Sequence, residues 1–132
     1  MTDLEARVSE RVSLVPGLDA PRRARGLARD LLGGRLADPR RRNDLLILVT
    51  ELVTNAVRHA GLGADDAIEL RLEGRTGAIR AEVRDPGPGF VPVEREPGPG
   101  GGFGLVLLRT ISDRWGIDAA GPTCVWFELD AS

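Results

Sequence analysis

Three side chains that could act together on one ligand are spaced along a single predicted helix. Glu51, Asn55 and Arg58 follow one another at intervals of four and three residues, which places them on one face of an α-helix. A glutamate can accept a proton, an asparagine can bind a hard cation through its carbonyl oxygen, and an arginine can hold phosphate oxygens. The set can therefore combine proton transfer with the binding of a cation and a phosphate.

The helix that carries these residues is amphipathic, and we expect it to run from about Pro39 to Ala60. Asp44 and Thr54 fall on the same side as the three residues above. The opposite side is apolar and consists of Leu45, Val49, Leu52, Val53 and Ala56. A polar stripe of this kind is most often simply the solvated face of a helix. Motifs elsewhere in the chain are therefore needed to distinguish a solvated face from a functional one.

The composition limits the class of partner and the compartment. The 132 residues fit one domain, with a core from about residue 8 to residue 129. The net charge of −2 gives no electrostatic reason to expect nucleic acid or an anionic membrane as the main partner. The single cysteine excludes an intrachain disulfide, and no lysine is available for catalysis. Because neither a signal peptide nor an apolar stretch of about 20 residues is apparent, we expect a cytoplasmic protein.

The periodicity of apolar residues predicts an α+β fold. Helices are expected at residues 20–32 and 105–114 in addition to the central one. The first of them carries four arginines on its outer side, which is either a solvated or a partner-binding face. Alternating apolar residues predict strands at residues 8–15, 68–72, 79–83, 115–119 and 123–129. Because alternation indicates one covered and one wet face, we expect a two-layer α/β sandwich in which three helices cover one face of a mixed sheet.

A long loop separates two of these elements, since residues 86–102 hold five prolines and six glycines. Loops of this length inside compact domains are usually functional or disordered. Asp85, at the end of the preceding strand, can accept a hydrogen bond from an exocyclic amine such as that of adenine. Beyond the loop, Gly102 and Gly104 open a helix whose free N–H groups favour phosphate. Each of these features also has an ordinary explanation as a loop or a turn.

The order of these motifs resembles the histidine-kinase-like ATPase superfamily, which also includes the ATPase domains of gyrase and of heat-shock chaperones. The motifs are Glu-x-x-x-Asn on a helix, Asp-x-Gly-x-Gly after a strand and Gly-x-Gly-Leu at a helix start. The resemblance covers about residues 19–129 and implies the Bergerat-type ATPase fold. Residues 50–60, together with Asp113-Arg-Trp-Gly116 and residues 125–129, look like the single-domain anti-sigma-factor kinases of actinobacteria.

The resemblance implies a role for each residue of the motifs. Glu51 would be the general base that takes a proton from the attacking hydroxyl group or water. Asn55 would bind Mg²⁺, Arg58 and His59 would lie near phosphate or ribose, and Asp85 would bind the adenine amine of ATP. The residues that shape the nucleotide lid, the phosphate cradle and the adenine end would be Gly87, Gly89, Gly102, Gly104, Leu105 and Thr123.

Absences in the sequence narrow the choice within the superfamily. A histidine autokinase needs a phosphoacceptor histidine on a dimerisation hairpin, but the only histidine of this chain lies in the nucleotide motif. Gyrase-type and chaperone-type ATPases complete their site with a lysine from a further domain, and this chain has no lysine. The resemblance therefore implies an ATP- and Mg²⁺-dependent serine/threonine protein kinase of the anti-sigma-factor type.

The substrate of such a kinase would be an anti-sigma-factor antagonist of the STAS fold, and a sigma factor is the alternative partner. Relatives pair as homodimers, although no residue pattern here marks a dimer face. A competing interpretation is an ATP-sensing binding module that sequesters a partner without phosphoryl transfer. The third interpretation is a small α/β domain with a glycine-rich loop and no bound nucleotide.

Overall fold

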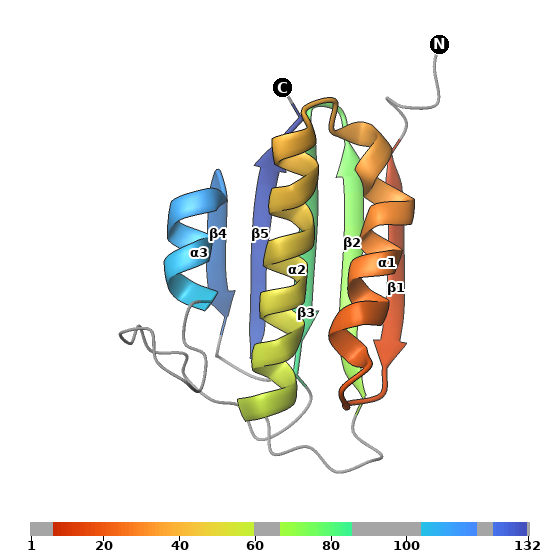
Figure 1. The fold of residues 1–132 in the computed structure, drawn as a ribbon, viewed down its shortest axis with the longest axis vertical. Helices are drawn as coiled ribbons and strands as arrows, with labels where there is room; N and C mark the ends of the chain where they lie inside the picture. The colour runs from red at the N-terminus through yellow and green to blue at the C-terminus, as the bar shows by residue number, and fades with distance from the viewer. Residues whose placement is uncertain (1–6, 60–66, 86–103, 119–122, 132) are drawn as a thin grey trace.

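The computed structural model describes residues 7–59, 67–85, 104–118 and 123–131. The elements in chain order are β1 (Val8–Leu14), α1 (Ala20–Leu32), the short 3₁₀ helix η2 (Gly33–Arg35), α2 (Pro39–His59), β2 (Ile68–Arg75), β3 (Ala78–Arg84), α3 (Gly104–Ile111), β4 (Arg114–Asp118) and β5 (Cys124–Asp130) (Figure 1). No helix in this part of the chain combines the length and the apolar character that crossing a membrane requires.

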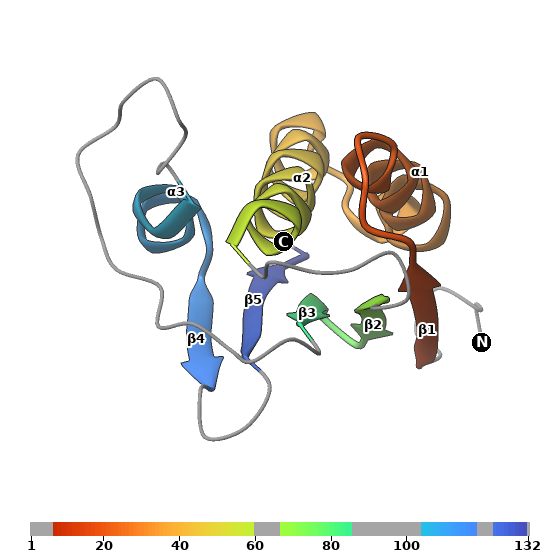
Figure 2. The same ribbon diagram turned by 90° about the horizontal axis from the view of Figure 1, so that it is seen from below.

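The strands form one sheet in the order β1-β2-β3-β5-β4. All three α-helices lie on the same face of this sheet, so the predicted two-layer α+β sandwich is confirmed (Figure 2). The prediction of a mixed sheet is wrong, because each of the four strand pairs is antiparallel. Strands β3 and β4 run in the same direction and are connected through α3. They form no parallel ladder because β5 lies between them and pairs with both in the opposite direction.

Helix α2 lies over the middle of the sheet and packs against β2, β3 and β5 as well as against α1 and α3. Its apolar side is buried as predicted, with no more than 5% exposure at any of Leu45, Val49, Leu52, Val53 and Ala56. Burying a side chain of the size of leucine or valine contributes roughly 1.5–3 kcal/mol. Helix α3 ends at Ile111, three residues earlier than predicted, because Arg114 already pairs with Glu128 in the sheet.

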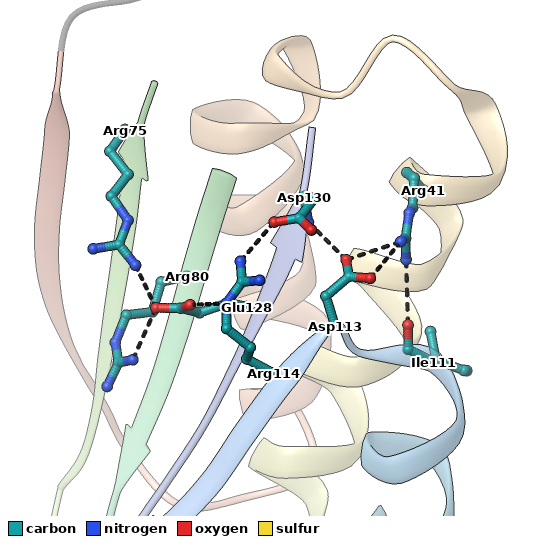
Figure 3. Close-up of polar contacts among 8 residues, drawn as sticks. All are labelled: Arg41, Arg75, Arg80, Ile111, Asp113, Arg114, Glu128 and Asp130. Carbon is teal, nitrogen blue, oxygen red and sulfur yellow. Dashed lines mark hydrogen bonds and ion pairs between the residues drawn. The ribbon is translucent and has the colours of Figure 1, made fainter. Parts of the chain in front are cut away.

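The face of the sheet without helices is held together by ion pairs around Glu128 on β5. This residue is 6% exposed and accepts hydrogen bonds from Arg75 on β2, Arg80 on β3 and Arg114 on β4 (Figure 3). Burial by itself raises the pKa of the Glu128 carboxyl. The hydrogen bonds from Arg114 and Arg80 and the charge of Arg75 outweigh this effect and hold the pKa below its ordinary value. One carboxylate thus connects four strands.

Replacing Glu128 with glutamine should lower the free energy of unfolding at neutral pH by about 1–3 kcal/mol, because three guanidinium groups lose a shared counter-charge. A carboxyl whose pKa is lowered by folding contributes its stability above the ordinary pKa and loses it as the pH falls through the folded value. The difference between the wild type and Glu128→Gln should therefore shrink below about pH 4. Urea denaturation across this range measures it, and a difference that does not change with pH would contradict the prediction.

Trp126 lies on the same face and depends on a glycine in the neighbouring strand. The guanidinium carbon of Arg80 lies 4.1 Å from the centroid of the indole ring, which is a cation–π contact. A β-carbon at Gly116 would come within 2.6 Å of the indole nitrogen of Trp126. The ring therefore occupies space that only glycine leaves free.

The variant Gly116→Ala should lower the free energy of unfolding by about 1–3 kcal/mol, because the indole ring has to move away from the new methyl group. Gly26→Ala is the matched control. A β-carbon at Gly26 meets only the side chain of Arg29, at 3.7 Å, so this variant should gain about 0.5–1 kcal/mol from helix propensity. Urea denaturation of both variants tests the contrast, which fails if Gly116→Ala is as stable as the wild type.

Candidate functional site

The C-terminal half of α2 carries the polar residues that the sequence singled out. Glu51 and Asn55 are half-buried, and Arg58, about one turn further on, is exposed. Their positions follow from the packing of the helix, since Leu52 and Ala56 beside them are buried in the core. The stripe therefore borders the core, with only its far end open to solvent. His59 is the last residue of α2, and its side chain lies outside the described part of the structure.

Asp85 and Thr123 lie side by side although they are far apart in the sequence. Asp85 directly follows β3, and Thr123 directly precedes β5. The backbone N–H of Asp85 donates a hydrogen bond of 2.9 Å to the carbonyl oxygen of Thr123, and both residues are only 2% exposed. At the end of a sheet, this pair offers hydrogen-bonding groups to a polar ring.

Helix α3 starts at the same end of the sandwich. Gly104 is its first residue and Leu105 its second; of their side-chain surroundings nothing is described. Figure 1 shows that the start of α3, the end of β3, the start of β5 and the C-terminal end of α2 lie at one end of the molecule. The roles predicted for Gly87, Gly89 and Gly102 stay predictions, because these residues lie outside the described ranges.

The groups at this end suit a cation that is bound together with an anionic ligand. Within the described residues, no three histidine, cysteine, aspartate or glutamate side chains come together as a metal site. Mg²⁺ is usually held by one or two protein oxygens together with phosphate and water oxygens. Asn55 can supply one such oxygen, and the free N–H groups in the first turn of α3 favour an anion. The donor set therefore fits Mg²⁺ that arrives with a phosphate ester.

The thiol of Cys124, next to Thr123, is not suited to nucleophilic chemistry. Cys124 is 7% exposed, and its burial raises the pKa of the thiol. The negative charge of Glu82 raises this pKa further, whereas Arg84 opposes the shift. The thiol therefore stays protonated at neutral pH, whereas the thiolate is the reactive form.

Sequence reasoning missed Arg41, which belongs to the same stripe of α2. Arg41, Asp44, Glu51, Asn55 and Arg58 are separated by three, seven, four and three residues, and these intervals keep them on one side of a helix. Arg41 forms ion pairs with Asp44 in its own helix and, beyond α3, with Asp113. The signal in the sequence is the spacing, because Arg41 lies three residues before Asp44 and extends the polar stripe by about one turn towards the N-terminus.

Comparisons with known proteins match most of the chain, including the elements that carry the site. A family model described as "Histidine kinase-like ATPase domain" matches residues 16–129. Among 18 matching chains of solved structures is the crystal structure of the RsbU and RsbW domains of Rv1364c from Mycobacterium tuberculosis. That chain is 23% identical, with a TM-score of 0.69, and the match covers 92% of this chain and 31% of that one. The likeness concerns the fold. No curated protein matches the sequence.

Proposed function

Because this chain belongs to the histidine kinase-like ATPase family, we propose that it binds ATP with Mg²⁺ and transfers the γ-phosphate to a serine or threonine of a partner protein. The observation that carries the proposal is the buried pair of Asp85 and Thr123. This pair lies at the end of the sandwich towards which the polar stripe of α2, with Glu51 and Asn55, also runs. The groups that we propose for the base and for the phosphates therefore come from the same end of the sandwich.

In this proposal Asp85 accepts a hydrogen bond from the adenine amine, and Thr123 contacts the adenine end. Asn55 would hold Mg²⁺ through its side-chain carbonyl oxygen, and the cation would supply positive charge to offset that of the phosphate oxygens. Glu51, one helical turn away, accepts the proton of the attacking hydroxyl group on its carboxylate. The phosphates and ribose are bound or enclosed by Arg58, His59, Gly87, Gly89, Gly102, Gly104 and Leu105.

The partner that we propose as substrate is a STAS-domain anti-sigma-factor antagonist, with a sigma factor as an alternative partner that is held rather than phosphorylated. The proposal is supported by the resemblance of residues 50–60 and 113–116 to single-domain anti-sigma-factor kinases. We further propose that the chain acts in the cytoplasm, where such partners are found.

Asp85 should make the site selective for adenine. The wild type should bind ATP more tightly than GTP, and Asp85→Asn should weaken ATP binding by about 1–3 kcal/mol, because a buried hydrogen bond is lost or poorly replaced. Asp30→Asn is the matched control, since the Asp30 side chain is 79% exposed on α1, and it should leave the affinity unchanged. Calorimetry gives both affinities. Equal affinity of the wild type for ATP and GTP would rule out Asp85 as the group that recognises the base.

The two neighbouring residues of α2 should have separable roles. Glu51→Ala should keep most of the ATP affinity but slow phosphoryl transfer by about 10²–10⁴-fold, because this is the rate enhancement that a general base usually contributes. Asn55→Ala should lose the Mg²⁺-dependent part of the ATP affinity together with activity. The assay uses radiolabelled ATP and a partner that has been recovered with the chain from its host and then purified.

The same assay separates a kinase from a binding module. A kinase leaves phosphoserine or phosphothreonine on the partner, and the two variants of α2 reduce it for different reasons. If the ATP-saturated wild type forms a stoichiometric complex with its verified partner and transfers no phosphate, the kinase proposal fails. An ATP-sensing module that sequesters its partner would then be the remaining function.

A further inference from the structure

We propose that the ion pair between Arg41 and Asp113 acts as a clamp on the orientation of helix α3. By holding the last turn of α3, the clamp sets the position in space of its first turn, and so positions the phosphate end of the nucleotide relative to Glu51 and Asn55. The inference rests on the ATP site proposed above. It concerns two residues that lie at the opposite end of the sandwich and do not touch the nucleotide, so that they act as positioning residues.

The clamp has a forked geometry that fixes both distance and direction. Nη2 of Arg41 donates hydrogen bonds to both carboxylate oxygens of Asp113, at 3.0 and 2.8 Å. Nη1 of Arg41 donates a third hydrogen bond of 3.2 Å to the carbonyl oxygen of Ile111, the last residue of α3 (Figure 3). The side chains of Arg41 and Asp113 are 25% and 27% exposed. A partly buried pair with several hydrogen bonds holds its partners more firmly than an exposed pair.

Asp113 is itself hydrogen-bonded to the sheet, so that Arg41 is paired with a residue whose own position is held by strand β5. The backbone N–H of Asp113 donates to the carbonyl oxygen of Glu128 at 3.0 Å. Oδ2 of Asp113 accepts a hydrogen bond of 2.7 Å from the backbone N–H of Asp130. The next residue, Arg114, donates hydrogen bonds to the carboxylates of Glu128 and Asp130. The clamp therefore connects α2, the end of α3 and strand β5.

Among the described residues, helix α3 packs mainly against two elements. It is eight residues long and packs mainly against α2 and against β4, the edge strand of the sheet. Within its described part, Leu108 alone is fully buried, and Leu107 and Ile111 are partly buried. A single buried side chain restrains the position of a short helix but leaves it free to tilt. The contacts of Arg41 with Ile111 and Asp113 add a directional restraint at the end of the helix.

Because α2 and α3 run antiparallel, the clamp at the end of α3 also affects the position of the start of α3. Arg41 lies in the first turn of α2 beside the last residue of α3, whereas Gly104 starts α3 at the opposite end. An eight-residue helix is about 12 Å long, so a tilt of about 5° at the clamp moves its start by about 1 Å. A displacement of this size at a binding or catalytic group can change rates by up to about 100-fold.

The adenine end does not depend on α3, because Asp85 and Thr123 are attached to β3 and β5. A positioning role of the clamp therefore predicts a selective effect on the phosphates. A general loss of folding would instead weaken the binding of every ligand that contains adenine.

The test uses Arg41→Met, which removes the guanidinium group and keeps an unbranched apolar side chain. Arg42→Met is the control, because Nη1 of Arg42 donates to the carbonyl oxygen of Leu36 at 2.9 Å, close in sequence. In the absence of nucleotide, Arg41→Met should speed hydrogen exchange at residues 108–111, whose amides are hydrogen-bonded within α3, on the order of tenfold, with strands β2 and β3 unchanged. Exchange in α3 that equals that of the wild type and of the control would overturn the clamp.

The second readout is the affinity for two ligands. In Arg41→Met, the affinity for ATP with Mg²⁺, measured by calorimetry, should fall on the order of tenfold. The affinity for adenosine, measured by nuclear magnetic resonance titration, should stay within about twofold because the adenine end is unaffected. Arg41→Lys keeps the charge but lacks the forked guanidinium group. Its affinity for ATP should therefore be intermediate between those of the wild type and Arg41→Met. If Arg41→Met does not fold, Arg41→Lys carries the same test.

The outcomes separate this inference from the proposed function. A wild type that binds neither ATP nor adenosine overturns the proposed nucleotide site. A wild type that binds ATP, together with variants at Arg41 that bind it equally well, overturns the clamp. An equal loss of ATP and adenosine affinity in these variants also overturns it, because the effect is then one of general stability.

Discussion

The burial of one side of α2 against the middle of the sheet is the constraint on which the rest of the structure depends. This helix touches three strands and both other α-helices, so its rotation about its own axis is fixed by the need to bury its apolar residues. Once that side faces the sheet, the direction in which the polar side chains from Arg41 to Arg58 project from the helix is also determined. The contacts at the start of the helix and the polar residues near its end are consequences of the same rotation.

The insertion of β5 between β3 and β4 is the second determinant. It brings the end of β3 next to the start of β5, which produces the buried contact between Asp85 and Thr123. It also moves β4 to the edge of the sheet and α3 with it. A short helix at an edge has little core to pack against, and polar contacts with Arg41 and Asp113 take over part of the restraint that apolar packing provides elsewhere.

This architecture divides the proposed nucleotide site into two parts that are packed differently. The adenine end lies on the sheet, where backbone hydrogen bonds and the ion pairs of Glu128 hold neighbouring strands together. The phosphate end lies between two helices, of which only α2 is deeply packed. A ligand that spans both parts would have one end on the sheet and one end whose position depends on two helices.

Residues 20–32 form a helix with the predicted bounds, and Glu51, Asn55 and Arg58 share a helix face as their spacing indicated. Hydrophobic periodicity determined these features because it reflects interactions between residues a few positions apart. The antiparallel pairing of β3 with β5, the contact of Asp85 with Thr123 and the pairing of Arg41 with Asp113 were decided only by the tertiary structure. Each joins segments that are distant in the chain, and their hydrogen bonds form only after strand order and register are set by packing of the whole core.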